Sequence, residues 1–331
     1  MTDEDDGLTY AEAGVDIGES EAATAALLGA TDDFAGDFAG LLDIGDRYLA
    51  LATDGVGTKL LVAEALGDYS TVGIDCIAMN VNDLVAQGVE PVAFVDYLAL
   101  EDPDDAVTEQ LGRGLARGAD LADVALLGGE TAIMPDVISG LDIAGTAAGL
   151  APHDGLFDGE AAPGDAIVGW ASSGIHSNGL TLAREAVTRD HAYTDPFPPD
   201  PDRSIGEVLL EPTRIYTGVL EALRNRETHA AAHVTGGGWT NVVRMGPHRY
   251  EVTDPFEAQP VYGFVQSTGD VDDAEMHRTF NMGTGFVAAL PPADADAVAA
   301  ETDGRVIGHV TESDGDAGTV EIRGLSLPAS E

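Results

Sequence analysis

The sequence has little positive charge and almost no lysine or cysteine. Its 331 residues contain 59 acidic and 15 basic side chains, which gives a formal net charge of −44. Such a polyanion repels nucleic acid and anionic membrane surfaces, so we exclude both as partners. The single cysteine, Cys76, cannot form a disulfide within the chain, and a reducing interior fits this composition.

Long apolar runs are also missing. No run approaches the roughly 18 residues of a membrane span, and the acidic first residues lack the basic and apolar regions of a signal peptide. We therefore expect a soluble, cytoplasmic protein. Arginine has replaced lysine at all but one position, and concentrated salt would screen the repulsion among the acidic groups. These features predict a halophile's cytoplasm.

The one lysine, Lys59, ends the segment Thr-Asp-Gly-Val-Gly-Thr-Lys at residues 53–59. The apolar stretch 48–52 before it predicts a strand, so we expect a loop at a strand end. Asp54 offers a hard carboxylate for Mg²⁺, Lys59 offers a charge for phosphate, and the two glycines let a ligand approach the backbone. A tight turn with a surface lysine is the alternative. The spacing fits neither a P-loop nor a dinucleotide fingerprint.

Two further segments present carboxylates. Apolar spacing at 72–87 predicts a helix that ends at Gly88, with Asn80 and Asp83 together on another face. A solvated helix acid is the alternative interpretation of Asp83. A predicted strand at 124–127 leads into Gly-Gly-Glu-Thr at 128–131, which we interpret as a glycine turn that carries Glu130.

The second half also places glycine loops at strand ends. A strand at 165–171 leads into Ser-Ser-Gly-Ile-His-Ser-Asn-Gly at 172–179 and then a helix, whose free amides would bind a substrate phosphate. His176 is a candidate donor to that phosphate. A strand at 228–234 carries His233, a candidate donor or acid/base group, and Thr-Gly-Gly-Gly follows it. For both histidines the alternative is a buried imidazole satisfied by protein groups.

The remaining pattern alternates short strands and helices, which predicts a two-domain mixed α/β chain. Pro, Gly and Asp mark 151–164 as the linker, so we divide the chain into residues 1–160 and 161–331. The other expected strands are at 91–100, 143–150, 286–290, 305–310 and 319–322. The other expected helices are at 19–28, 104–118 and 293–300, with one that starts at 211–216 and an exposed loop at 190–206.

Taken in order, the motifs resemble the aminoimidazole ribonucleotide synthetase family, also called phosphoribosylformylglycinamidine cyclo-ligase. They are TDGVGTK at 53, GID at 73, NVNDLVAQGVEP at 80, DY at 96, GGET at 128, SSGIHSNG at 172, EPTRIY at 211, HVTGGG at 233 and MHRTFNMGTG at 276. Each motif alone is weak, but nine in the same order span nearly the whole chain.

The resemblance implies an enzyme of purine biosynthesis that uses ATP to close the imidazole ring of formylglycinamidine ribonucleotide. It implies a homodimer whose N-terminal halves form a shared β-barrel, an ATP site near the subunit boundary and a C-terminal α/β sandwich. Carried onto this chain, it implies metal and catalytic roles for Asp54, Asp83 and Glu130, with His176 and His233 as further catalytic candidates. For ATP and Mg²⁺ it implies Gly55, Gly57, Thr58, Lys59, Asn80, Gly128, Gly129 and Thr131. For the ribonucleotide it implies Gly174, Ser177, Asn178, Gly179, Thr235, Gly236, Gly237 and Gly238.

The chain departs from the family pattern at Ile133, where an acidic residue is common, so the resemblance implies no acid at this position. The alternatives are other ATP-using members of the superfamily, such as selenophosphate synthetase, thiamine-phosphate kinase or the preceding pathway enzyme. Selenophosphate synthetase usually carries a reactive Cys near its N-terminus, and none occurs before Cys76. A nucleotide-binding module without turnover is a further alternative, which the presence of both sets of loops disfavours.

Overall fold

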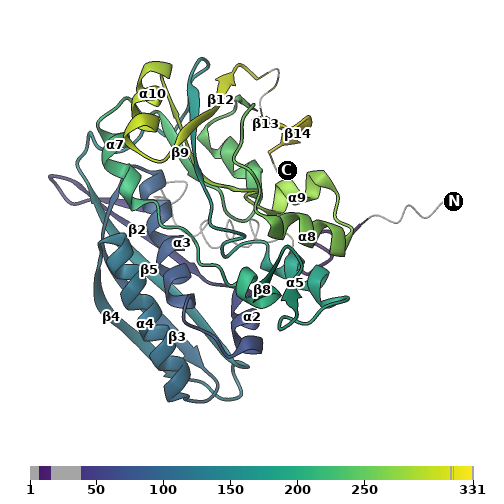
Figure 1. Ribbon diagram of the computed structural model, residues 1–331. Coiled ribbons are helices and arrows are strands. Elements are labelled where there is room, and N and C mark those ends of the chain that lie inside the picture. The colour runs from purple at the N-terminus through teal and green to yellow at the C-terminus, as the bar shows by residue number, and fades with distance from the viewer. Residues whose placement is uncertain (1–6, 16–38, 314, 316, 330–331) are drawn as a thin grey trace.

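The strands of the protein form two large sheets (Figure 1). The computed structural model describes residues 7–15, 39–313, 315 and 317–329. One sheet has the order β1-β2-β5-β3-β4, and the other has the order β14-β13-β10-β12-β6-β11-β9. The predicted helix at 19–28 lies outside the described residues. Among the described residues, no helix combines the length and apolar character needed to cross a bilayer.

The first sheet and its helices come from the N-terminal half. The strands are β1 (Gly40–Asp43), β2 (Tyr48–Gly55), β3 (Glu90–Leu100), β4 (Ala125–Ile133) and β5 (Leu141–Ala151). The helices are α2 (Lys59–Leu66), α3 (Val72–Ala86) and α4 (Asp105–Ala122). Strand β3 pairs with β5 in antiparallel fashion and with β4 in parallel fashion. Figure 1 shows α3 and α4 together over one face of this sheet.

The second sheet and the remaining helices come from the C-terminal half. The strands are β6 (Ala166–Ala171), β9 (Ala230–His233), β10 (Arg249–Val252), β11 (Thr284–Leu290), β12 (Arg305–Thr311), β13 (Thr319–Ile322) and β14 (Leu325–Pro328). The α-helices are α5 (Leu180–Thr188), α6 (Ile205–Leu209), α7 (Leu220–Arg224), α8 (Pro260–Gly269), α9 (Asp273–Thr279) and α10 (Pro292–Glu301). The 3-10 helices are η1 (Thr217–Val219) and η2 (Gly238–Met245), and β7 (Pro196–Phe197) pairs with β8 (Asp200–Ser204) as a small hairpin.

Helix α3 lies between the two halves. Of its 15 residues, 14 are buried, because it packs on β2, β3 and β5 on one side and on β9 and η1 on the other. A helix that is buried all round can carry polar side chains only where protein groups satisfy them. Its buried polar residues, Asp75, Asn80 and Asn82, are therefore informative about what lies against them.

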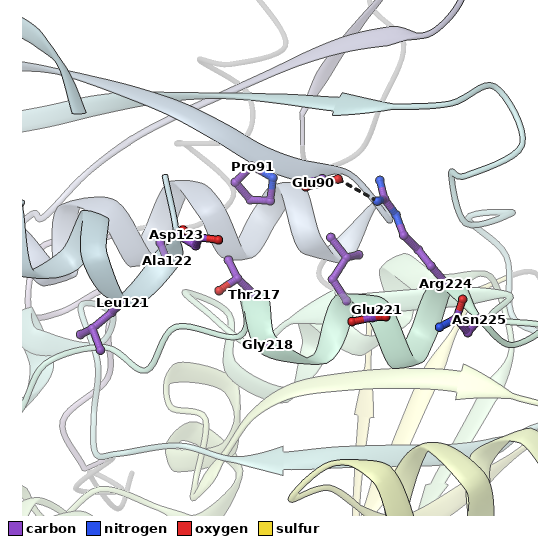
Figure 2. A pocket seen from close by; sticks show the side chains of 11 residues that line it. Glu90, Pro91, Leu121, Ala122, Asp123, Thr217, Gly218, Glu221, Arg224 and Asn225 are labelled. Carbon is purple, nitrogen blue, oxygen red and sulfur yellow. Dashed lines mark hydrogen bonds and ion pairs between the residues drawn. The ribbon is translucent and has the colours of Figure 1, made fainter. Parts of the chain in front are cut away.

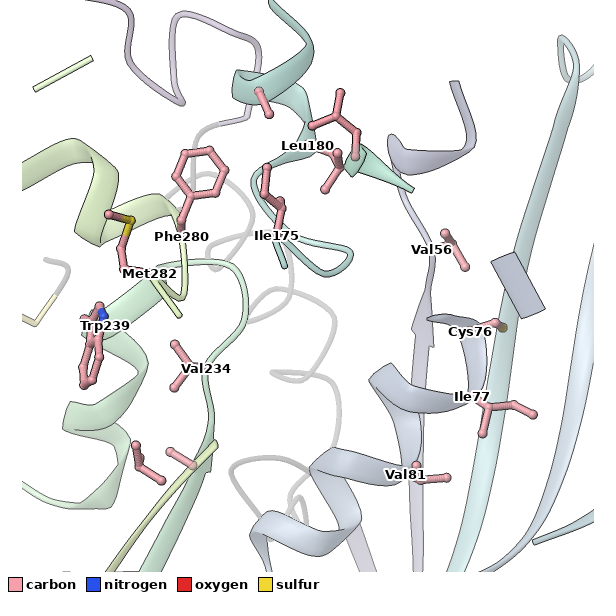
Figure 3. Close-up of a cluster of buried hydrophobic side chains, with 14 of the residues drawn as sticks. Val56, Cys76, Ile77, Val81, Ile175, Leu180, Val234, Trp239, Phe280 and Met282 are labelled. Carbon is pink, nitrogen blue, oxygen red and sulfur yellow. The ribbon is translucent and has the colours of Figure 1, made fainter. Parts of the chain in front are cut away.

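One buried apolar cluster runs through both halves of the chain. Figure 3 shows Val56, Cys76 and Ile77 from the first half on one side and Ile175, Val234 and Trp239 from the second half on the other. Because the cluster is continuous, the two halves share a core.

The predicted element types agree with the structure over most of the described chain, and four segments differ. The Gly-Gly-Glu-Thr segment lies within β4, because β4 pairs with β3 as far as Ile133. Helix α4 passes Gly118 and ends at Ala122, since Gly118 packs against α3, where a Cβ would lie 3.1 Å from the Cα of Ile74. Residues 211–216 are not helical, because side chains of α3 bind their backbone groups. The predicted loop at 190–206 includes the β7–β8 hairpin.

The crossing of α3 and α4 depends on glycine at position 73. A Cβ added to Gly73 would lie 2.1 Å from the backbone nitrogen of Leu115 and 2.4 Å from the carbonyl carbon of Gly114. We expect Gly73→Ala to lower the free energy of unfolding by about 1–3 kcal/mol, because the helices must move apart. Chemical denaturation at high salt measures this change.

Gly112 is the matched control, since it lies in α4 with no atom within 4 Å of an added Cβ. Gly112→Ala should stabilise the protein by up to about 1 kcal/mol through helix propensity. Equal effects of the two substitutions would contradict the crossing argument.

Candidate active site

The Asp54 segment is a strand end followed by a very short loop. Strand β2 runs to Gly55, and α2 begins at Lys59, so only residues 56–58 form the loop. Gly57 has a φ of 67° and open space around it, which leaves its backbone available to a ligand. Asn80 of α3 donates from Nδ2 to the backbone oxygen of Asp54 at 3.2 Å and so ties the strand end to the helix.

Asp54 and Asp83 are neighbouring carboxylates on the α3 side of the sheet. Surrounding protein, which disfavours the charged form, and the negative charge of Asp83 together raise the pKa of Asp54 to about 6. The residue nevertheless has accessible surface, and the Asp83 side chain is 22% exposed. Two accessible acids in this relation can share a cation with a bound polyphosphate.

His233 is buried, and both of its ring nitrogens have protein partners. Asn82 uses Nδ2 to donate to the backbone oxygen of Arg214 and Oδ1 to accept from the amide of Tyr216, which fixes the orientation of its amide group. The same Nδ2 lies 3.3 Å from Nε2 of His233, so Nε2 is the acceptor. Nδ1 therefore carries the proton and donates to Asp83 Oδ1 at 3.0 Å. In this arrangement His233 orients Asp83 and has no exposed surface for a substrate.

The sequence predicts that Lys59 offers its charge to a phosphate, but the structure buries this charge within the protein. Its side chain has no exposed surface, its Nζ lies 2.8 Å from Asp75 Oδ2, and it donates to the backbone oxygen of Glu211 at 2.7 Å. A protein carboxylate therefore neutralises the ammonium in place of a nucleotide phosphate. The neighbouring Thr58 contacts Thr181 of α5 through their hydroxyl oxygens, 2.9 Å apart.

His176 is likewise buried in the structure. Its Nε2 accepts hydrogen bonds from the amides of Ser173 at 3.1 Å and Arg214 at 3.4 Å, so it joins two loops of the C-terminal half. Burial and the positive charges around it lower its pKa well below the usual value, and the imidazole is neutral. Nδ1 then carries the proton and has no hydrogen-bond partner among the described residues. We had expected His176 to face the phosphate, and only 2% of it is exposed.

The two glycine loops of the C-terminal half meet beside α3. Ser177 donates to Asp75, and Asn178 contacts the Met79 sulfur from Nδ2 at 3.7 Å. A Cβ on Gly236 would lie 3.2 Å from Oδ1 of Asn178, which shows how closely the Thr-Gly-Gly-Gly segment approaches. Gly179 of the first loop and Gly237 and Gly238 of the second have positive φ angles, which glycine adopts readily. The backbone oxygen of Gly174 and the backbone amide of Thr235 are held by hydrogen bonds.

Glu130 does not join Asp54 within one chain, contrary to the expectation that three carboxylates converge. In the sheet Asp54 pairs with Gly145, Gly145 with Asp96, and Asp96 with Gly129. Three strand spacings are about 14 Å, and the side chain that follows Gly129 points to the opposite face. Accordingly, none of the described residues form a group of three His, Cys, Asp or Glu side chains that could hold a metal ion. Gly128 and Thr131 lie on the same free edge strand as Glu130.

Several polar residues that organise this site lie in the motifs quoted from the sequence, which gave them no role in the site. Asp75 and Asn82 are two helical turns apart on α3, and the seven-residue spacing of polar groups in an otherwise apolar helix was the available signal. Thr213 binds Asp75 through both its amide and its hydroxyl group. Asp96 faces the same side of the sheet as Asp54, and burial raises its pKa.

Two cavities help to locate the site. One of about 650 Å³ lies between the end of α4 and α7, as Figure 2 shows, and none of the predicted site residues line it. The guanidinium of Arg224 there is held by the backbone oxygen of Gly88 and by Glu90. A second cavity of about 190 Å³ borders Ser173 and Gly174 of the predicted phosphate loop. The smaller cavity is therefore the one that adjoins the candidate site.

Known families and structures match this arrangement over nearly its full length. The model of the AIR synthase related protein N-terminal domain matches residues 36–151, and that of the C-terminal domain matches residues 162–321. A Thermus thermophilus structure, tt0281, has a TM-score of 0.64 at 24% identity and covers 94% of this chain and 97% of its own. AaThiL complexed with AMPPCP and TMP has a TM-score of 0.65 at 16% identity, with 95% and 96% covered. These likenesses, all under 25% identity, show the fold.

Sequence relatives are much closer. The protein from Methanosarcina mazei named phosphoribosylformylglycinamidine cyclo-ligase is 48% identical, over 92% of this chain and 96% of its own length. The protein of the same name from Thermococcus gammatolerans is 45% identical, over 87% and 90%. On this evidence, the chain belongs to the phosphoribosylformylglycinamidine cyclo-ligase family.

Proposed function

We propose that the protein uses ATP to close the imidazole ring of formylglycinamidine ribonucleotide, with release of aminoimidazole ribonucleotide, ADP and phosphate. The observation that carries this proposal is the near-complete coverage of cyclo-ligase relatives at 45–48% identity. The meeting of the Asp54, Ser177 and Gly236 loops around α3 supports it, because two substrates must be held side by side.

The chemistry needs an activated formyl oxygen. Transfer of the γ-phosphoryl group of ATP to that oxygen gives an iminophosphate, the amidine-side nitrogen attacks the same carbon, and the C–O bond then breaks with release of phosphate. Positioning and neutralisation of charge contribute most of the catalysis in such phosphoryl transfers. We assign the nucleotide to the side of Asp54 and Gly57, in residues 1–160, and the ribonucleotide to Ser177, Asn178 and Gly236, in residues 161–331.

Magnesium fits only part of the predicted ligand set. Mg²⁺ commonly uses one or two carboxylates together with phosphate oxygens and water, and Asp54 and Asp83 are suited to that number. When bound, the ion would neutralise charge on the transferring phosphoryl group. His233 holds Asp83 in place for this role, while Glu130 faces the other side of the sheet.

We also propose a homodimer. On the first sheet, away from α3 and α4, large apolar side chains are exposed, among them Leu51, Val95 and Tyr97. Among the residues that the structure describes, strand β4 pairs only with β3, and Leu127 on it is 70% exposed. A free apolar edge of this kind needs a cover, and a second copy of the sheet provides one that closes a barrel. In this dimer Glu130 faces the partner.

The proposed reaction is tested by ADP release in molar potassium chloride. ADP should form only when formylglycinamidine ribonucleotide is present, with one aminoimidazole ribonucleotide for each ADP. Thiamine phosphate and selenide serve as control substrates, and turnover of either in place of the ribonucleotide would contradict the proposal. We also propose that the protein works in a cytoplasm of concentrated salt. If its fold and activity were the same at low salt as at molar salt, this proposal would be contradicted.

Asp83→Asn should lower kcat by about 100-fold or more, because it removes a charge that faces the transferring phosphoryl group. The fold should remain intact, since an asparagine oxygen can still accept from His233. Steady-state kinetics as a function of magnesium concentration measure the loss. Asp120→Asn, on the exposed surface of α4, is the control and should leave kcat unchanged. Normal magnesium dependence in Asp83→Asn would remove this residue from the metal site.

Leu127→Glu should convert the dimer to a monomer, because it places a charge on the free edge of β4. Light scattering coupled to gel filtration should give twice the chain mass of 34.1 kDa for the parent protein. Leu121→Glu is the control, since Leu121 is 57% exposed on α4 on the other side of the sheet. A monomeric parent protein, or a Leu127→Glu variant that remains dimeric, would refute the proposed interface.

A further inference from the structure

Asp75 is a buried carboxylate on which polar groups from three other segments converge. Its Oδ1 accepts hydrogen bonds from Lys59 Nζ at 2.9 Å, Ser177 Oγ at 3.1 Å, Thr213 N at 2.7 Å and Thr213 Oγ1 at 2.6 Å. Neither Asp75 nor Lys59 has exposed surface, and Ser177 and Thr213 are also buried. Ligands therefore cannot reach Lys59 or Asp75 directly.

The contacts of Asp75 join the two sides of the proposed reaction. Lys59 follows directly after the loop on the nucleotide side, and Ser177 precedes Asn178 on the phosphate side. Figure 1 shows α2, which Lys59 begins, beside α3 on the side of the N-terminal half that faces α5 and β8. Helix α2 contacts α3, α5 and α6. The carboxylate of Asp75 therefore binds residues next to both loops.

Stability alone does not explain this ion pair. Taking two charges out of water has a large desolvation cost, and a buried pair can often be replaced by apolar residues without loss of stability. The pair instead fixes the positions of the groups around it, because each hydrogen bond to Oδ1 of Asp75 restricts its donor to a narrow range of distance and angle. Ser177 is thus fixed relative to Lys59 by two short contacts.

We propose that Lys59 and Asp75 are positioning residues that hold the Ser177–Asn178 segment in register with the Asp54–Thr58 loop, so that the phosphate end of the ribonucleotide is presented correctly toward ATP. The inference rests on the proposed cyclo-ligase reaction. It gives the only lysine of the chain a role through Asp75 and Ser177, without contact to the nucleotide.

The main test compares Lys59→Met, Asp75→Leu and the double variant. Each single variant leaves a buried charge without its counter-charge and should lower the melting temperature strongly. The double variant removes the unpaired charge and should recover part of that loss, since the amide and hydroxyl of Thr213 and the hydroxyl of Ser177 still lose their acceptor. Its KM for the ribonucleotide should stay at least tenfold above the parent value, with the KM for ATP within threefold. A double variant with parental stability and a parental KM for the ribonucleotide would overturn the proposal.

Thr213 provides a test that leaves the ion pair intact. Thr213→Val removes one donor to Asp75 at nearly constant volume and should raise the KM for the ribonucleotide several-fold, whereas Thr213→Ser keeps the hydroxyl group and should restore it. This comparison decides the matter if the double variant does not fold. Equal KM values in the two variants would count against the positioning role.

Hydrogen exchange separates this inference from the proposed reaction. In the ligand-free protein, backbone amides of residues 172–179 should exchange faster in the stable double variant and in Thr213→Val, but not in Thr213→Ser. Failure of the parent protein to form ADP would refute the reaction and leave the exchange result informative about the contact. Unchanged exchange at 172–179 in both altered proteins would refute the positioning role itself.

Discussion

The polar face of α3 sets the geometry of the whole site, because its buried side chains bind backbone groups of the other half. Asp75 and Asn82 bind the backbone of residues 213–216, and Asn82 also reaches His233. A buried polar group that loses its partner retains the full cost of desolvation, so these contacts form together or not at all. The loops on both sides are consequently anchored to one helix, which is the arrangement that accurate placement of two substrates requires.

This organisation divides the ionisable groups into two sets. His176, His233, Lys59 and Asp75 are buried and hold loops or other side chains in place. Asp54 and Asp83 remain accessible, and the raised pKa of Asp54 reflects repulsion between them as well as the protein around it. A cation bound with a polyphosphate would relieve that repulsion. The chemistry of the proposed reaction accordingly depends on few groups, and most of the motif residues position those few.

The apolar pattern predicted the elements well because β5 alternates between buried and partly exposed positions, while α3 and β11 are largely apolar stretches of helix and strand length that are buried almost throughout. It failed where tertiary contacts override local preference. The glycines at 128–129 suggested a turn, yet Gly129 lies within a strand where a Cβ would be 2.5 Å from the Asp96 carboxylate. Lys59 was identified as significant, but its partner lies 16 residues away on another helix, and no local pattern indicates that pairing. Convergence of Glu130 with Asp54 could not be judged without the strand register, which places them on opposite faces.

The burial of Lys59 also determines how the folded protein meets reagents in solution. It is the only lysine in the chain, and its amine is enclosed against Asp75. Acylating reagents therefore find no side-chain amine on the native surface, and covalent attachment by amine coupling has to use the chain terminus. Modification of Lys59 becomes a direct signal that the two halves have separated or unfolded.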